Sequence, residues 1–334
     1  MAAPQVLENV RARSVEIKER RSSNKRTALI VPGGVRRAIC NCAALAALNT
    51  LGIRHFDSVY AVSAGAINAV YGLADQAALG VTIYLEEVSK FRFINPFRFW
   101  NIIDLDYLFR EVIYGTKPLD IPTLRNNPSQ LCVLTADITN GQAKWFTANA
   151  DNLTDILKAA CSTEVPFGPP FSIGGNLYRD GYLLEPVPLF SALAGNYTDI
   201  MVLLNKPLPQ DDAPFPKWLQ KGLINRWNKR AFGPGLVQRC ENDWREYNRA
   251  LEIVRTGRYE KPDGNIVGIA CIAPDKAIGM FESNTRRLFQ AAHSSWKNTL
   301  ITFGAPEYGS DTFLKVLSDV GLKRSTLDEL SGNV

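Results

Sequence analysis

The sequence of 334 residues predicts an α/β fold in which helices cover both faces of a mainly parallel sheet. Two observations support this prediction. Short apolar runs, typical of buried strands, are followed by glycine-containing turns and then by apolar positions at helical spacing. Helices between successive strands are the connection that parallel strands require. A helical, basic region late in the chain predicts a cap or an insertion.

The expected elements follow one another along the chain. Strands are expected at 28–31, 56–62, 130–136, 143–147, 199–204 and 264–272, and helices at 36–50, 64–73, 153–160 and 285–299. We expect a polar leader (1–26), a catalytic core (27–205), and a helical cap with late core elements (206–334) that forms one continuous domain with the core.

Composition narrows the class of protein. Apolar residues make up 46% and charged residues 21% of the chain, which is ordinary for a globular protein with a large core. The net charge of +5 suits an anionic membrane surface or an acidic substrate. No long Lys/Arg run accompanies this charge, so we expect no nucleic-acid partner.

Cysteine usage and the start of the chain indicate the cytoplasm. The six cysteines lack the paired spacing of zinc sites and of disulfide frameworks, which predicts free thiols and no metal site. The N-terminal stretch is charged and lacks the apolar segment of a signal peptide. No run of about 18 uncharged apolar residues occurs, so any membrane contact is expected to be peripheral.

Ser63 stands where a strand passes through a small-residue turn into a helix, which is the context of a nucleophile elbow. The sharp turn needs small residues two positions before and after the serine, and Ala61 and Gly65 meet that need. The helix N-terminus favours the alkoxide character that develops on attack. The alternative interpretation is a serine that caps an ordinary strand-to-helix turn.

A glycine loop follows the first strand. Acyl transfer needs backbone N–H donors near the developing oxyanion, and glycines let the backbone approach a substrate closely. Gly33, Gly34 and Val35 are the candidate donors. The alternatives are a dinucleotide-binding turn, which would lack its third glycine here, and a plain tight turn.

The base for Ser63 is predicted to be a carboxylate, because neither histidine is well placed. His55 lies eight residues earlier, at the other end of the intervening strand and roughly 26 Å away at about 3.3 Å per residue. His293 lies in a helical pattern and remains an alternative partner.

Asp180 is the preferred base. It follows an extended segment over 171–177, and Gly181 lets the chain turn so that the carboxylate can point into the site. Asp137, at the end of a strand, is a second candidate. The Asp-Gly pair could instead be a hairpin turn, and the Asp263-Gly264 pair has the pattern of a simple loop.

In this order, these motifs resemble the patatin-like phospholipase family over residues 27–205. The resemblance implies a three-layer α/β/α sandwich with no metal or organic cofactor. It implies a Ser–Asp dyad that hydrolyses acyl esters of lipids through an acyl-enzyme, as a phospholipase A or lysophospholipase does. By matching position, Ser63 would be the nucleophile and Asp180 its base, while Gly33, Gly34 and Val35 would form the oxyanion loop. Arg36 matches a basic position that would steady the loop or meet a lipid phosphate.

Four positions depart from the family pattern. Pro32 and Arg37 stand where glycines are common, Ala61 replaces the first glycine of the elbow, and Tyr182 stands where a small residue is usual. These changes bear on efficiency and on substrate size. The alternatives are therefore a small-ester esterase or an acyltransferase with the same dyad, or a catalytically weak lipid-binding protein on the same fold.

Two stretches mix aromatic and basic side chains, as the surfaces of membrane-associated proteins do. The first is 91–100, and the second, 217–230, predicts an amphipathic helix. Both are candidates for contact with an anionic membrane surface. The alternative for 217–230 is a cap helix that packs its aromatic side on the core.

Overall fold

The computed structural model describes residues 4–98, 101–163, 168–208, 236, 243–305 and 309–331. These residues form a nine-stranded sheet. Its strands are β1 (Thr27–Val31), β2 (Ser58–Val62), β3 (Gln130–Asp137), β4 (Gln142–Ala148), β5 (Phe171–Ile173), β6 (Asn176–Asp180), β7 (Asp199–Leu203), β8 (Arg258–Glu260) and β9 (Ile266–Ile272). Each expected strand is present, whereas the sequence pattern does not predict the short β8.

The centre of the sheet is parallel. β1 pairs in parallel with β2 on one side and with β7 on the other, and the parallel run continues to β3 and to β9. Antiparallel strands follow at both ends, where β4, β5 and β6 lie on the β3 side and β8 pairs with β9. The predicted α/β class with a parallel central sheet is therefore confirmed.

The two edges of β3 have different neighbours. β4 pairs with β3 over 131–137 and so occupies one edge. Because a strand has only two edges for pairing, β2 and β6 must share the other edge. β2 pairs up to Val62, which lies opposite Leu134, and β6 ends with Asp180 opposite Thr135. The ends of β2 and β6 therefore meet at consecutive residues of β3.

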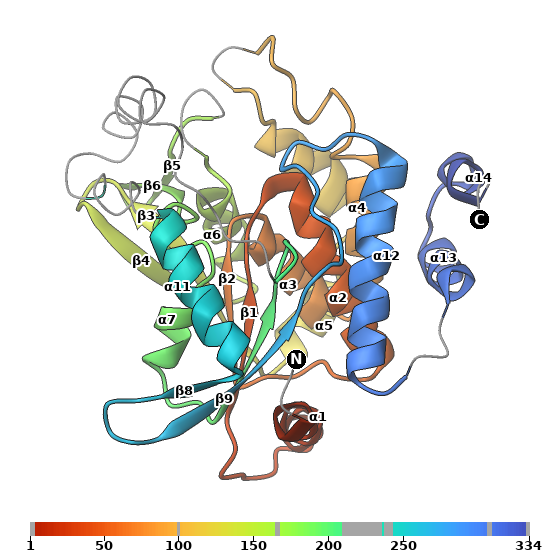
Figure 1. Cartoon of the computed structure of the whole chain (residues 1–334). Helices are drawn as coiled ribbons and strands as arrows, with labels where there is room; N and C mark the ends of the chain where they lie inside the picture. The colour runs from red at the N-terminus through yellow and green to blue at the C-terminus, as the bar shows by residue number, and fades with distance from the viewer. Residues whose placement is uncertain are drawn as a thin grey trace.

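Helices cover both faces of the sheet, as Figure 1 shows. One layer contains α2 (Ile39–Thr50), α3 (Ala64–Leu73), α4 (Ala77–Glu86) and α12 (Thr285–Thr302). The other contains α7 (Leu189–Leu193) and α11 (Asp243–Thr256). In β1, Leu29 and Val31 face the first layer while Ala28 and Ile30 face the second, which explains its unbroken apolar run. The expected three-layer arrangement is confirmed.

Seven further helical elements of the described residues lie outside these two groups. They are α1 (Pro4–Lys18), the 3₁₀ helix η1 (Val35–Ala38), the π-helix η2 (Tyr107–Thr116), α5 (Ile121–Asn126), α6 (Leu153–Ala160), α13 (Ser310–Asp319) and α14 (Arg324–Ser331). The expected polar leader thus contains a helix. Its Val6 and Val10 are buried, and its Asn9 amide donates to the Asp199 carboxylate at the start of β7. The N-terminal helix is therefore packed onto the sheet.

The segment 171–177, expected to be one extended run, is a hairpin. β5 and β6 pair through a turn at Gly174 and Gly175, whose φ angles are +58° and +84°. Two consecutive residues with positive φ define a type I′ turn, and glycine adopts that conformation without steric cost. The glycine pair was the sequence signal for this turn, and the expectation of a continuous strand was wrong.

One predicted surface cannot be placed. The amphipathic helix expected at 217–230 lies outside the described residues, as do the last two residues of the 91–100 stretch. Among the helices that the structure describes, none is long and apolar enough to cross a membrane.

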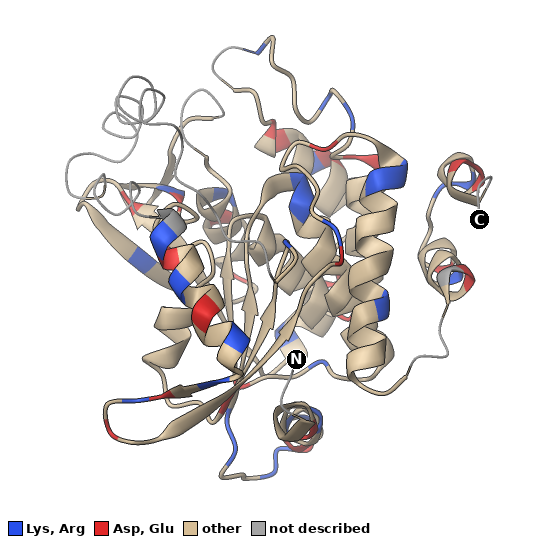
Figure 2. Cartoon of the chain, in the orientation of Figure 1, with Lys and Arg blue, Asp and Glu red and all other residues tan. Residues whose placement is uncertain are grey.

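Basic and acidic residues are interspersed over the elements drawn in Figure 2.

The start of α3 packs directly on the end of β1 at Gly65. A Cβ atom on Gly65 would lie 2.2 Å from the carbonyl oxygen of Val31 and 2.5 Å from that of Pro32. Both oxygens belong to the backbone, so neither can yield without displacing the glycine loop. Because the φ of Gly65 is not in the left-handed region, the glycine is required by this close approach rather than by its backbone angles.

We expect Gly65→Ala to lower the free energy of unfolding by about 1–3 kcal/mol, because the added methyl group forces the backbone apart. Urea unfolding followed by circular dichroism measures the loss. Gly279→Ala is the matched control, since a Cβ there meets only the Glu282 backbone nitrogen, at 3.9 Å. Equal unfolding midpoints for the two variants would contradict this explanation of Gly65.

Candidate active site

Ser63 is the first residue after β2 and the N-cap of α3. Its φ and ψ angles are 57° and −139°, a backbone conformation that residues other than glycine rarely adopt. Such a conformation costs on the order of 1–3 kcal/mol and is found most often at functional sites. The side chain makes no capping hydrogen bond to α3. Capping therefore does not account for the serine, whereas the strained strand–turn–helix geometry suits a nucleophile elbow.

The glycine loop passes beside Ser63. A Cβ atom on Gly33 would lie 2.4 Å from the Ser63 Cβ, so a larger residue would push the loop away from the serine. Gly34 has a φ of 148°, and Val35 has a φ of 51°, which is rare for a β-branched residue. Within the described residues, the N–H groups of Gly34 and Val35 have no hydrogen-bond acceptor in the protein. Both remain available to a ligand.

Buried asparagines fix the direction of the peptide groups in this loop. Asn205 Nδ2 donates to the Gly33 carbonyl oxygen at 2.6 Å, and Asn41 Nδ2 donates to the Pro32 carbonyl oxygen at 2.7 Å. Asn68 Nδ2 donates in turn to Asn41 Oδ1 at 2.7 Å. In a trans peptide the N–H points opposite to the C=O. These bonds therefore turn the N–H groups that follow the two carbonyls away from the asparagines.

Arg36 ties the glycine loop to two distant segments. Its Nε donates to the Val88 carbonyl oxygen at 2.7 Å, and its Nη1 donates to the Phe281 carbonyl oxygen at 3.1 Å. Its backbone N–H donates to the Met280 carbonyl oxygen at 3.0 Å. Burial lowers the pKa of the guanidinium. Of the two roles expected for Arg36, these contacts suit the steadying of the loop.

Asp180 is brought towards Ser63 by β3. Because Val62 lies opposite Leu134 and Asp180 lies opposite Thr135, the two chain ends are separated by one step along β3, roughly 3.3 Å. The Asp180 side chain is buried, and its Oδ1 accepts the N–H of Tyr182 at 2.9 Å. The predicted nucleophile and the predicted base, which are far apart in the sequence, thus lie at one point of the sheet.

Gly181 is explained by packing. A Cβ atom there would lie 2.6 Å from Leu134 Cγ and 2.9 Å from the Leu134 carbonyl oxygen. A turn does begin at Gly181, since its carbonyl oxygen accepts the N–H of Leu184 at 2.9 Å, but its φ is not in the left-handed region, so close packing rather than backbone freedom requires glycine there. The hairpin turn belongs to Gly174 and Gly175, so the Asp-Gly pair is not a hairpin turn.

The two histidines lie away from this point. His55 precedes β2, at the end opposite Ser63, and its Nδ1 is 3.4 Å from Asn127 Oδ1. His293 lies on α12, where its ring stacks on Phe289 with centroids 6.1 Å apart. Neither histidine lines the cavity at Ser63.

Asp137, the second candidate base, and Asp263 are both engaged in turns. Asp137 accepts the backbone N–H of Asn140 at 3.0 Å and its side-chain amide at 2.9 Å. Asp263 accepts the backbone N–H of Asn265 at 3.0 Å in the loop between β8 and β9, as its sequence pattern indicated. Asp180 is thus better placed than Asp137 to act on Ser63.

An apolar cavity opens at Ser63. It encloses about 600 Å³, including the part open to solvent, and passes between α3, α4 and the segment that follows α4. Its lining is mainly hydrophobic and includes Ile67, Ile83, Phe93, Ile103 and Leu108. A cavity of this apolar character suits an apolar ligand that presents one polar group at Ser63. Gly33 and Asp180 are not part of the lining.

Two ionisable side chains in the cavity wall are deeply buried. Burial raises the pKa of the Tyr84 hydroxyl well above its ordinary value, and burial also raises the pKa of the Cys161 thiol. Both residues line the cavity. Electrostatic interactions at Ser63 are therefore strengthened by a surrounding of low polarity.

Sequence reasoning missed the asparagines. Asn41 and Asn68 lie in helices of otherwise apolar character, and both are almost fully buried. Asn205 follows β7. A buried amide in an apolar helix needs a hydrogen-bond partner, and that requirement was the available signal.

The sequence is similar to a family of phospholipases and to an uncharacterized protein. The family model of patatin-like phospholipases matches residues 29–193, a range that contains Ser63 and Asp180. The uncharacterized protein YjjU of Escherichia coli (strain K12) is 24% identical over 238 residues, which cover 68% of this chain and 65% of YjjU.

A solved structure is also similar. The structure of human GIVD cytosolic phospholipase A2 with a methyl gamma-linolenyl fluorophosphonate inhibitor and terbium chloride has a TM-score of 0.35 and 12% identity, covering 98% of this chain and 62% of that chain. The chain thus spans slightly less than two thirds of the length of either relative. Residues 29–193 of this chain are therefore a patatin-like phospholipase domain.

Proposed function

We propose that this protein hydrolyses acyl ester bonds of lipids, with Ser63 as the nucleophile and Asp180 as its base. The observation that carries the proposal is the meeting of β2 and β6 on one edge of β3, which leaves Val62, the residue before Ser63, about one strand step along β3 from Asp180. The patatin-like phospholipase domain supports a lipid ester as the substrate.

In the first half of the reaction, Ser63 Oγ attacks the ester carbonyl carbon while its proton passes to the Asp180 carboxylate. One electron pair of the C=O bond moves to the oxygen. When the C=O bond re-forms, the alcohol leaves and takes the proton from Asp180. In the second half, water attacks the acyl-enzyme and gives a proton to Asp180, which returns it to Ser63 as the fatty acid is released.

The developing oxyanion needs preorganised donors. The N–H groups of Gly34 and Val35 have no acceptor among the described residues, and that of Gly33 faces away from the buried asparagines. The N–H of Ala64 at the first position of α3 is a further candidate, because the first N–H groups of a helix have no intrahelical acceptor. Donors of this kind contribute most where water is excluded.

The apolar cavity supports a lipid rather than a small ester. Its hydrophobic lining begins at Ser63 and continues under the segment after α4. A fatty acyl chain placed there would be removed from water, which is favourable by about 0.8 kcal/mol for each buried methylene group. The ester carbonyl would then lie at the polar end of the cavity, beside Ser63.

An aromatic rim supports peripheral contact with an anionic membrane. We define the rim as Phe91, Phe97 and Phe281, whose side chains are exposed by 57%, 75% and 48%. The rings of Phe91 and Phe97 lie 6.0 Å apart, and Arg92 beside them is exposed. Arg36 binds carbonyl groups of both segments that carry the rim. Exposed aromatic rings beside basic residues suit the headgroup region of an anionic bilayer.

Ser63→Ala should lower kcat on a long-chain lipid ester by at least about 10³-fold, because the attacking oxygen is lost. Asp180→Asn should lower it by about 10²–10⁴-fold, because an amide cannot accept the serine proton. Fatty acid release, measured with protein whose circular dichroism matches wild type, checks both. His55→Gln and His293→Gln are the matched controls and should retain activity. A loss confined to the His293 variant would replace the dyad by a serine–histidine pair.

The pH dependence gives an independent check of the base. The rate should fall as the pH is lowered and Asp180 becomes protonated, since only the carboxylate accepts the serine proton. The residual rate of Asp180→Asn should lack this acidic limb, while both histidine variants should keep it. An acidic limb that persists unchanged in Asp180→Asn would assign the titrating base to another group.

Replacing both Phe91 and Phe97 by Ser should weaken binding to vesicles that contain phosphatidylglycerol, because two exposed apolar side chains are removed from the contact. Cosedimentation measures the binding, and hydrolysis of a soluble short-chain ester should change little. Ile266→Ser is the matched control: its side chain is 62% exposed, and it begins β9 at the end of the sheet away from Ser63. Equal vesicle binding by wild type and the double variant would contradict the proposed contact of the aromatic rim with the membrane.

A further inference from the structure

Two departures from the family pattern touch each other. Arg37 stands where a glycine is common, and Tyr182 stands where a small residue is usual. In the folded chain, Arg37 Nη2 donates to the Tyr182 hydroxyl oxygen at 3.2 Å across a sequence separation of 145 residues. The two larger side chains therefore form one contact rather than two unrelated changes.

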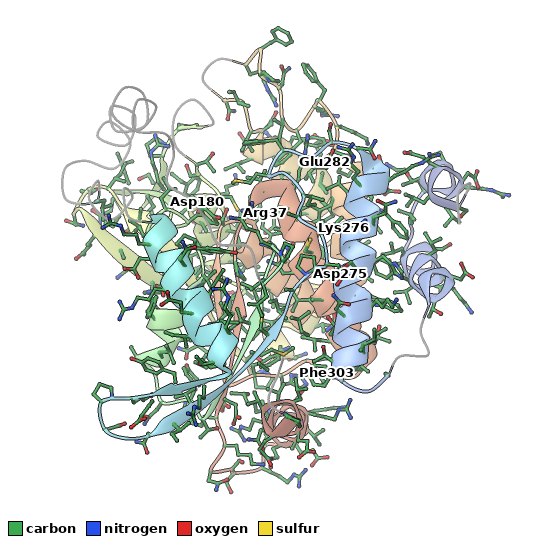
Figure 3. The ribbon with its side chains drawn as sticks, viewed as in Figure 1. Arg37, Asp180, Asp275, Lys276, Glu282 and Phe303 are labelled. Carbon is green, nitrogen blue, oxygen red and sulfur yellow. The ribbon has the colours of Figure 1, made fainter. Side chains whose placement is uncertain are left out.

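This contact lies against the catalytic elements. A Cβ atom on Gly34 would lie 3.3 Å from Arg37 Nε, so the guanidinium runs alongside the glycine loop. A Cβ atom on Gly33 would lie 3.0 Å from Tyr182 Cδ2 as well as close to the Ser63 Cβ. Figure 3 shows Arg37 and Asp180 at the same end of the sheet.

Among the described residues, none forms an ion pair with the Arg37 guanidinium. Arg37 is only 8% exposed, and its Nε has no hydrogen-bond acceptor within the described residues. A guanidinium has five N–H donors, and here one of them is engaged by a protein oxygen, that of Tyr182. A buried charge without a partner is costly unless a ligand completes its bonds.

We propose that Arg37 and Tyr182 form a subsite for an anionic oxygen group of the substrate, the phosphate or carboxylate that accompanies the scissile ester. This inference rests on the proposed function and adds the substrate class. A guanidinium is suited to such groups, because its planar N–H donors match the oxygens of phosphate and carboxylate. Arg36 does not offer its guanidinium to an anionic group of the substrate, since backbone carbonyl oxygens accept hydrogen bonds from its Nε, Nη1 and Nη2.

The tyrosine fixes the arginine. Its hydroxyl accepts from Nη2, and its backbone N–H donates to Asp180 Oδ1 at 2.9 Å. The anion-binding group and the base are thus held by the two ends of one residue. An anionic group on Arg37 would therefore be held at a fixed distance from the Ser63–Asp180 pair, which would orient the ester.

The first test compares two substrates that differ only in charge, monooctanoylglycerol phosphate and monooctanoylglycerol. For wild type, kcat/KM should favour the phosphate. Arg37→Gln should lower the ratio of the two kcat/KM values by about 10- to 100-fold, as expected for the loss of a charge-assisted contact. Lys276→Gln, which removes an exposed charge, is the matched control and should leave the ratio unchanged. A ratio that Arg37→Gln changes by less than about threefold would overturn the subsite.

The second test requires no hydrolysis, so it separates this proposal from the proposed function. In the Ser63→Ala background, calorimetry should detect binding of monooctanoylglycerol phosphate, and Arg37→Gln should weaken it at least tenfold. Inorganic phosphate, titrated in the same way, distinguishes a subsite for the lipid headgroup from one that accepts the free anion. Binding of both probes that is insensitive to Arg37→Gln contradicts the proposal. If Arg37→Gln does not fold, Arg37→Lys takes its place. This variant keeps the positive charge but loses the planar N–H donors of the guanidinium, so the ratio of kcat/KM for the phosphate to kcat/KM for the uncharged ester should still fall.

Discussion

The site depends on the direction of two backbone carbonyl groups. Those of Pro32 and Gly33 accept hydrogen bonds from Asn41 and Asn205, and they are thereby held towards the interior. Because each peptide is planar, the N–H groups on the other side of these peptides are turned outward. Gly65 presses α3 against the same carbonyl of Pro32, so the serine turn and the glycine loop are positioned by one another. Loss of this contact would affect both.

The same loop connects the site to its surroundings. Arg36 joins it to residues 88–89, which precede Phe91 and Phe97 of the aromatic rim, and to residues 280–282, which include Phe281. The lining of the apolar cavity includes both Ser63 and Val88. A lipid surface contacting the rim and an acyl chain in the cavity would therefore contact elements that Arg36 already ties to the glycine loop. The contact of Arg37 with Tyr182 lies next to that loop, at the position proposed for the anionic group.

Local features of the site could be predicted from the sequence, whereas its long-range contacts could not. The small residues around Ser63 and in the loop reflect steric demands within a few residues, so they are visible in the sequence. The alignment of Asp180 with Ser63 depends on how β2 and β6 share β3, which no local pattern encodes. The contact between Arg37 and Tyr182 is invisible for the same reason, although each residue stood out alone. At Gly181 the chain turns as the sequence suggested, whereas the close packing on Leu134 that requires a glycine could not be predicted from the sequence.

The most direct test of the central claim is reaction of the intact protein with a fluorophosphonate, followed by mass spectrometry of its peptides. The reagent forms a phosphonyl ester with an activated serine hydroxyl and releases fluoride. The account predicts one phosphonyl group on the peptide that contains Ser63, none in Ser63→Ala, and much slower labelling in Asp180→Asn. Labelling of a different residue, or a folded wild-type protein that does not react at all, would contradict the assignment of Ser63 as the nucleophile.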